Sequence, residues 1–205
     1  MSTAEPRWRR LGPDERREQI LTCAIELFGE RPYSAVSTTE LANRAGVARG
    51  LINHYFGTKR DLYLEVVRRM VMIPQVAVDR LPKGTLEERV TESIRWFLDT
   101  VSRHSKAWLA AIGAEGVDPE VERILAEADE RAADRVLEAT GLAAETAHRE
   151  ELRAMIRAYG GLVKSAAREW LVRGALTRPQ VEVLMNTTLL AIIREASPGL
   201  DSTAT

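Results

Sequence analysis

Residues 37–60 constrain the fold of this chain more than any other stretch, because they predict two short helices joined by a tight turn. Ser37 and Glu40 match the capping box that opens many helices, in which the serine oxygen accepts an amide hydrogen and the glutamate reaches back. Gly46 supplies the turn, and small residues beside it let the second helix cross the first at a steep angle. The segment predicts a helix-turn-helix, whose second helix enters the major groove of DNA.

The exposed side of the second predicted helix decides between DNA binding and plain packing. Two short helices around a glycine also occur as ordinary helical core, where the solvated face carries Glu/Lys pairs at helical spacing. Here Arg49 and Asn53 are donors suited to base edges, and Gly50 permits close approach. The donors that suit phosphates are Tyr55, Thr58 and Lys59. This pattern favours DNA binding.

The run from Arg17 to Leu64 resembles the DNA-binding domain of the tetracycline-repressor (TetR) family. The matching stretches are REQILTCAIELFGERPYSAVSTTELANRAGV, the motif HYFGTK at residues 54–59, and DLYLEV. They cover about a quarter of the chain, and the rest matches only through its all-helical pattern and length. Pattern and resemblance together give a predicted set of DNA-contacting residues: Thr38, Thr39, Ala48, Arg49, Gly50, Leu51, Asn53, His54, Tyr55 and Lys59.

Two positions depart from the family pattern. Ala48 opens the second helix where the family usually has Ser or Thr, so one N-cap and one phosphate contact are expected to be missing. Asn53 stands where the family usually has Tyr, and an asparagine side chain is able to read adenine. These departures leave the predicted fold intact and bear on which DNA sequence is read.

Composition agrees with a regulator that acts in the cytoplasm. The chain has 205 residues, 45% hydrophobic and 29% charged, which allows one medium domain or two small ones. No apolar run approaches the roughly 18 to 20 residues of a membrane span, and the N-terminus lacks the apolar core of a signal peptide. The single cysteine, Cys23, excludes an intrachain disulfide framework.

Charge is distributed unevenly along the chain. Residues 1–60 carry a formal charge of +3 and the remainder −4, within a total of −1. The positive end coincides with the predicted DNA-binding segment, as phosphate contacts require. The leader Arg7-Trp8-Arg9-Arg10 is compatible with a basic arm that lies along DNA, and equally with a plain disordered tail.

Helix-capping and helix-ending residues divide the chain into about nine helices without strand-like alternation, so the predicted fold class is all-α. The resemblance implies the same number. Thr85 with Glu88, Asp118 with Pro119, and Thr177 are expected to open helices, and Gly141 and Gly174 to end them. The predicted organisation is a flexible basic arm at 1–12, a three-helix helix-turn-helix head at 13–60, a connecting helix and linker at 61–84, a ligand-binding and dimerisation domain at 85–197, and a disordered tail at 198–205.

The last two predicted helices, near residues 145–173 and 178–195, are apolar on more than one side. Such a helix needs a second partner, and a four-helix interface across a twofold axis supplies one. Burial of both helices within one chain is the alternative. The residues predicted to form a homodimer interface are Leu162, Ala166, Trp170, Val181, Leu184, Met185, Thr188 and Ile192.

Aromatic residues concentrate in the middle helices, which suits a pocket for an apolar or aromatic small molecule. Aromatic residues at helical spacing also form plain core, and the expectation of a pocket comes mainly from the resemblance. The predicted lining is Trp96, Phe97, Trp108, Ile112, Glu115, Met155 and Tyr159, with Glu115, His104 and Lys164 as polar anchors.

No enzyme, metal site or cofactor is expected. The three histidines, His54, His104 and His148, lack metal-ligand spacing, and no Gly-rich phosphate loop is present. The hypothesis is a homodimeric repressor that leaves a palindromic DNA operator when a small-molecule effector binds. Two alternatives stay open: an architectural DNA-binding protein without effector, and an all-α interaction protein.

Overall fold

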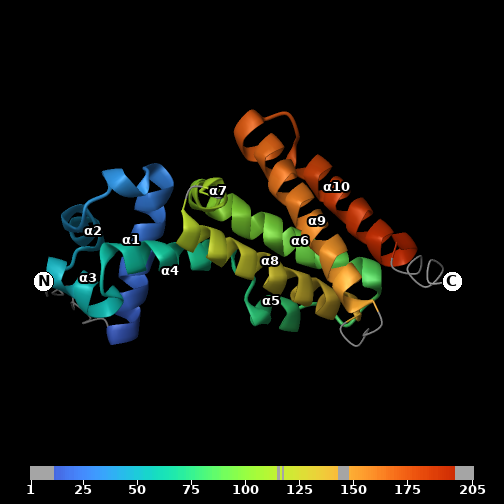
Figure 1. Ribbon diagram of the computed structural model, residues 1–205, viewed down its shortest axis with the longest axis horizontal. Helices are drawn as coiled ribbons and strands as arrows, with labels where there is room; N and C mark the ends of the chain where they lie inside the picture. Colours follow the sequence, from blue (N-terminus) through green and yellow to red (C-terminus); the bar gives the residue numbers. More distant parts are fainter. Residues whose placement is uncertain (1–11, 115, 117, 143–147, 197–205) are drawn as a thin grey trace, which may run out of the picture. The chain divides into compact units, whose positions relative to one another are not determined.

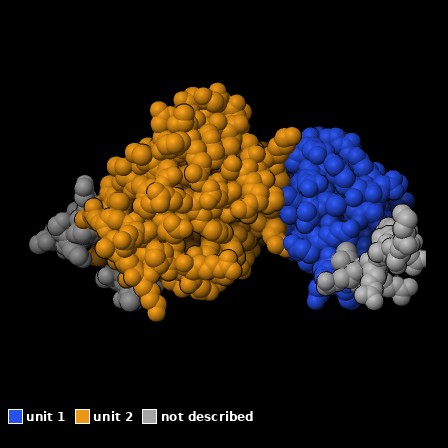
Figure 2. All heavy atoms as spheres, turned by 180° about the vertical axis from the view of Figure 1, so that it is seen from behind, with its two compact units in different colours: residues 1–66 blue, residues 67–205 orange. Residues whose placement is uncertain are grey.

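The computed structural model describes residues 12–114, 116, 118–142 and 148–196 (Figure 1). None of these residues lies in a β-strand, and nine of the helices span eight residues or more, which confirms the predicted all-α fold. The chain divides into two compact units, residues 1–66 and residues 67–205 (Figure 2). Residues 1–11 and 197–205 lie outside the described part, and with them the predicted tail at 198–205 and all of the predicted arm at 1–12 except Gly12. No helix in that part is long and apolar enough to cross a membrane.

Unit 1 contains α1 (Pro13–Glu30), the short η1 (Tyr33–Ala35), α2 (Thr38–Ala45), α3 (Arg49–Phe56) and the first part of α4 (Lys59–Val71). Proline suits the first position of α1, where its missing amide hydrogen would have no helical acceptor. The apolar sides of these helices meet in one core. Its fully buried side chains are Ile20, Leu21, Leu27, Leu41, Ile52 and Leu62.

The turn between α2 and α3 depends on Gly46, whose φ of 62° lies in the left-handed region that favours glycine. Ser37 caps α2 as predicted, because its Oγ accepts the amide hydrogen of Glu40 at 3.1 Å. The second half of the predicted capping box is wrong. The Glu40 carboxylate pairs with the Arg31 guanidinium instead of reaching back to Ser37, because a charged donor binds a carboxylate more strongly than a neutral amide.

The first turn of α4 is closed by Thr58 and Asp61. Asp61 Oδ2 accepts hydrogen bonds from the Thr58 amide at 2.9 Å and from the Thr58 hydroxyl at 2.6 Å. The Asp61 amide in turn donates to Thr58 Oγ1 at 3.1 Å. The two Thr58 donors hold the pKa of Asp61 below its usual range, the hydroxyl contributing more than the amide.

Asp61→Asn is expected to lower the melting temperature of unit 1 at pH 7. A depressed folded-state pKa means that the carboxylate stabilises the fold above about pH 4, and that this stability is lost as pH falls further. The melting deficit of the variant should therefore shrink between pH 7 and an acid pH below the lowered pKa of Asp61, where the parent carboxylate becomes protonated. Thermal unfolding at both pH values measures this, and an equal deficit at both would contradict the role of the ionised group.

Unit 2 contains the end of α4, then α5 (Gln75–Asp79), α6 (Leu86–Arg103), α7 (Ser105–Gly113), α8 (Pro119–Thr140), α9 (Arg149–Arg168) and α10 (Arg178–Ala191). The π-helical turns η2 (Glu169–Arg173) and η3 (Ile192–Ala196) extend α9 and α10. The predicted caps are confirmed for α6 at Thr85 and Glu88, for α8 at Asp118 and for α10 at Thr177. Gly141 and Gly174 end α8 and the η2 extension of α9 as predicted.

Helix α5 was not expected, since residues 61–84 are predicted as a connecting helix followed by a linker. Pro74 precedes its first turn, and a helix of five residues is too short to show an apolar period. The Gln75 side-chain amide donates to Asp79 at 3.1 Å and to Glu138 of α8 at 2.9 Å. These bonds attach α5 to α8.

The core of unit 2 lies among α6, α8, α9 and α10, which pack against one another (Figure 1). The Tyr159 hydroxyl donates to the Met185 carbonyl at 3.1 Å, which links α9 to α10 inside this core. Burial raises the pKa of Tyr159, so its hydroxyl keeps its proton. The buried core residues are Val90, Ile94, Leu98, Ala133, Ile156, Tyr159, Ala166, Val181, Met185 and Leu189.

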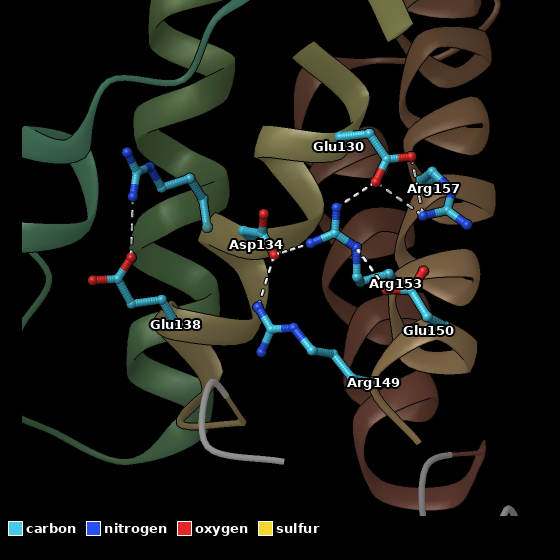
Figure 3. A network of polar contacts seen from close by, with 8 residues as sticks. Glu130, Asp134, Glu138, Arg149, Glu150, Arg153 and Arg157 are labelled. Carbon is cyan, nitrogen blue, oxygen red and sulfur yellow. Dashed lines mark hydrogen bonds and ion pairs between the residues drawn. The ribbon is translucent and has the colours of Figure 1, made fainter. Parts of the chain in front are cut away.

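An ion-pair network joins α8 to α9 (Figure 3). The guanidinium of Arg153, whose side chain is only 16% exposed, pairs with both Glu130 and Asp134. Arg157 pairs with Glu130 at 3.1 Å and Arg149 pairs with Asp134 at 3.0 Å. The two acids lie one turn apart on α8 and would repel each other without these partners. The network joins the polar sides of α8 and α9, next to the buried residues of α9 that pack in the core.

Candidate nucleic-acid interface and ligand cavity

Helix α3 is held to unit 1 by one fully buried side chain, Ile52. Its opposite side is exposed and carries Arg49, Gly50, Asn53 and His54. The spacing of these residues places Arg49 and Asn53 one turn apart on the same side of the helix. This is the arrangement a recognition helix needs, with base-edge donors outward and an apolar anchor inward.

Arg49 is the arginine in the described part of unit 1 that has no side-chain partner. Within residues 12–66, the remaining arginines all contact other side chains. These contacts are Arg16 with Gln19, Arg17 with Glu65 and the Phe56 ring, Arg31 with Glu40, Arg44 with Glu30, and Arg60 with the rings of Tyr33 and Tyr63. The fold positions its other guanidinium groups and leaves that of Arg49 available.

The predicted phosphate donors are placed less uniformly. The Lys59 ammonium donates to the Tyr33 carbonyl at 2.7 Å and lies 4.0 Å from the centre of the Tyr33 ring. The Thr58 hydroxyl is used by Asp61. The imidazole of His54 meets the Tyr55 ring edge to face at 5.1 Å. Lys59 and Thr58 therefore already have partners within the protein, where they stabilise the start of α4.

The remaining predicted contact residues surround the start of α3. Ala48 and Thr39 are exposed, whereas Thr38 and Leu51 are half-buried. Ala48 occupies the N-cap position with an extended backbone and forms no side-chain cap. The helix therefore lacks a side-chain N-cap, as the departure at Ala48 predicts.

Unit 2 encloses a cavity of about 170 Å³, measured for the centre of a water-sized sphere. Five of the predicted pocket residues line it. Phe97 and Trp108 meet edge to face there, with ring centres 6.1 Å apart. The five are Trp96, Phe97, Trp108, Ile112 and Tyr159.

The other pocket predictions have different outcomes. Met155 does not line the cavity, whereas the next residue, Ile156, does. Lys164 lines the cavity, and its ammonium pairs with Asp129 at 2.8 Å, but His104 is not part of the wall. Glu115 lies outside the described residues.

Several polar groups of the cavity wall are bound by the protein itself, whereas Arg135 Nε is buried there without a hydrogen-bond partner. The hydroxyls of Ser93, Thr140 and Tyr159 donate to backbone carbonyls, and Lys164 is neutralised by Asp129. Among the described residues, no group of three or more His, Cys, Asp or Glu side chains is arranged to hold a metal ion. The cavity therefore suits non-covalent binding of a mainly apolar molecule.

The model of the family described as "Bacterial regulatory proteins, tetR family" matches residues 20–66. A second model, described as "Tetracyclin repressor-like, C-terminal domain", matches residues 86–192, more than half of the chain. The chain belongs to the TetR family.

Relatives of this TetR-family protein carry regulator names. The HTH-type transcriptional activator FasR of Mycolicibacterium smegmatis is 31% identical over 170 residues, covering 80% of this chain and 76% of FasR. The HTH-type transcriptional regulator BetI of Rhizobium meliloti is 29% identical over 54% of this chain and 57% of BetI. Membership of this family establishes the chain as a DNA-binding transcriptional regulator rather than an enzyme.

Solved structures confirm the TetR fold. A tetR-family regulator from Streptomyces coelicolor has a TM-score of 0.69 at 24% identity, covering 93% of this chain and 87% of that one. The fatty acid degradation regulator FadR from Bacillus halodurans has a TM-score of 0.63 at 16% identity, covering 91% and 98%. At these identities the likeness supports the fold of the TetR regulator alone.

The structure revises the set of residues that this TetR regulator can offer to a partner chain. Val181, Met185 and Ala166 are buried in the core of their own unit, so they leave no surface for a second copy. Leu162, Trp170 and Ile192 also pack against that core, partly exposed, and Thr188 is half-buried. Leu184 is exposed as the prediction needs, beside the exposed Val183. A 3.6-residue period shows that two sides are apolar and does not show which one faces inward.

Sequence reasoning missed most of the small residues in the cavity wall of this TetR regulator. Helix α8 contributes a row at helical spacing, and α5 contributes Ala77 and Val78. The row was visible in the sequence as small and apolar residues three or four apart: Leu125, Ala128, Ala132, Val136 and Ala139. The large aromatic residues indicated the pocket, whereas the small residues leave the space in it.

Proposed function

We propose that this TetR-family regulator binds a palindromic DNA operator as a homodimer, and that a mainly apolar small molecule in the cavity of unit 2 releases it. The observation that carries this proposal is the cavity itself, with aromatic and aliphatic walls and polar groups of which most are bound by the protein. Such a space favours an apolar occupant. Since the DNA partner of a bacterial regulator lies in the cytoplasm, we place the protein there.

The homodimer is supported by exposed faces that lack charge. On α9 the exposed positions after Glu151 are all small, and α10 exposes Val183 and Leu184. In a chain with 29% charged residues, uncharged outward faces on two neighbouring helices are typical of a protein interface. The proposed interface residues are Ala154, Ala158, Gly161, Ser165, Val183, Leu184 and Thr187.

The coupling between ligand and DNA runs through α4. Val71, the last residue of this helix, lines the cavity, and the helix begins at Lys59, directly after the recognition helix and its turn. Two heads must present their recognition helices about one DNA turn apart, roughly 34–36 Å, or at a larger spacing set by the dimer. A ligand that favours another position of α4 shifts the population toward a spacing that fits DNA less well.

Release on ligand binding makes the protein a repressor in this proposal. The relative FasR is named as an activator, which is the opposite sense of regulation. The direction of the ligand effect distinguishes them, because recruitment to DNA by ligand would contradict the repressor assignment and leave the DNA-binding function intact.

Titration of the full chain against labelled DNA from its own upstream region tests the proposal. We expect a sequence-specific complex with two chains per site, and a light-scattering mass of twice 22.9 kDa in solution. Trp96 and Trp108 line the cavity, so a bound ligand should change the tryptophan fluorescence at concentrations that also release the DNA. A monomer in solution would contradict the proposed homodimer. Ligand binding detected by fluorescence with no change in DNA affinity would contradict the proposed release of DNA by ligand.

A further inference from the structure

Gly50 has no structural reason within its own unit to be glycine. Its backbone is helical rather than left-handed, and a Cβ built on it meets no heavy atom within 4 Å. Alanine would favour the helix more than glycine does. The absence of a side chain therefore serves a contact made outside the protomer, on the exposed side of α3.

Arg49 and Asn53 flank that bare position. Arg49 is the arginine of residues 12–66 without a side-chain partner, and the Asn53 side-chain amide also has none in the described structure. An unpaired guanidinium is a bidentate donor suited to O6 and N7 of guanine, and a carboxamide matches N6 and N7 of adenine. The short Asn53 side chain reaches a base edge only if the helix backbone comes close to the groove floor, which Gly50 allows.

We propose that α3 reads a guanine through Arg49 and an adenine through Asn53, with Gly50 as the point of closest approach to DNA. Four residues of helix rise about 6 Å, which spans at most about two base-pair steps of roughly 3.4 Å each, whatever the angle between the helix and the DNA axis. The guanine and the adenine therefore lie within about two steps of each other in each half-site. The inference rests on the DNA-binding function and is independent of ligand and of the cavity.

Modified bases test the assignment atom by atom. The full chain first selects its binding site from random DNA, and each guanine and adenine of the half-site is then replaced by its 7-deaza analogue. These analogues lack the N7 acceptor and keep Watson–Crick pairing. We expect the parent to lose about fivefold or more in affinity at one guanine and at one adenine, the lower end of the effect of a bidentate base contact.

The variants assign each loss to a side chain. Arg49→Ala should become insensitive to the 7-deazaguanine and stay sensitive to the 7-deazaadenine, and Asn53→Ala should do the reverse. Arg44→Ala is the matched control, because Arg44 is an exposed arginine of the same unit that already pairs with Glu30 at 2.8 Å. It should keep both sensitivities. If Arg49→Ala weakens binding equally on every sequence, Arg49 contacts phosphate and the assignment is overturned.

Gly50→Ala separates close approach from folding. We expect an unchanged or higher melting temperature, since the added methyl group meets nothing within 4 Å in the protomer. DNA affinity should fall by about fivefold or more on every sequence, while the pattern of analogue sensitivities stays that of the parent. Parent-like affinity for this variant would overturn the proposed approach. A parent chain that selects no sequence would overturn base reading altogether.

Discussion

A Gly160→Leu variant is expected to bind its operator as tightly as the parent and to lose its response to the ligand. Gly160 lies in the middle of α9 and lines the cavity, and a Cβ built on it meets no heavy atom within 4 Å. A leucine therefore extends into space of about 170 Å³ that we assign to the ligand. Overpacking of this kind costs about 1–3 kcal/mol, or roughly 5- to 150-fold in ligand affinity.

The measurement pairs a fluorescence titration of ligand with a DNA-binding titration on the same preparation. Gly160→Ala is the control, since one methyl group improves the helix and occupies little of the cavity. It should keep most of the ligand affinity. A leucine variant that still releases DNA at parental ligand concentrations would place the ligand elsewhere.

Gly161→Arg is expected to convert the dimer to a monomer and to abolish specific operator binding. Gly161 is exposed in the protomer, within the row of small residues on α9 that we assign to the partner. A dimer would have to bury the new charge without a counter-charge, and twofold symmetry would introduce it twice. The expected cost is at least about 3–5 kcal/mol, the effect of an uncompensated buried charge.

Light scattering measures this outcome directly, as a fall from twice 22.9 kDa to 22.9 kDa. Ala126→Arg, at an exposed position of α8, is the matched control and should remain dimeric. The ligand should still bind the Gly161→Arg monomer, because the side chain points to solvent there. A dimeric Gly161→Arg variant would exclude this face of α9 from the interface.

Helix boundaries were predictable from sequence where their signals are local. The caps at Thr85, Asp118 and Thr177 involve backbone amides or side chains two or three residues away, so sequence alone identifies the partners. Glu40 shows where this reasoning fails. Its partner, Arg31, precedes it by nine residues and reaches it only because the chain folds back at η1.

The recognition helix was predictable for a related reason. An eight-residue helix has one anchor, Ile52, so the remaining residues are assigned to the outside with little ambiguity. The helices of unit 2 are longer and have apolar residues on two sides. Val181 and Leu184 are nearly one turn apart in sequence, yet one is fully buried and the other exposed. Only the contacts of α10 with α6 and α9 decide between them.

The cavity required knowledge of how elements meet. Phe97 and Trp108 lie eleven positions apart in the sequence, on different helices, and their rings meet in the cavity wall. Helix α5, which supplies another part of the wall, is too short to be seen in a sequence pattern. The rotation of α9 follows from the packing of buried residues such as Ile156 and Tyr159 against helices far away in the sequence. Ile156 lines the cavity, whereas the preceding residue, Met155, points to another side of α9 and does not.

The pairing of arginines within unit 1 has a consequence for the ionic behaviour of the complex. A guanidinium bound to Glu65, Glu40 or Glu30 already has its counter-charge, so its approach to DNA displaces few condensed cations. The affinity of the described part of unit 1 should therefore fall only gently with salt concentration, compared with proteins that neutralise many phosphates. Discrimination between operator and other DNA then persists at ionic strengths where charge-driven binding is lost.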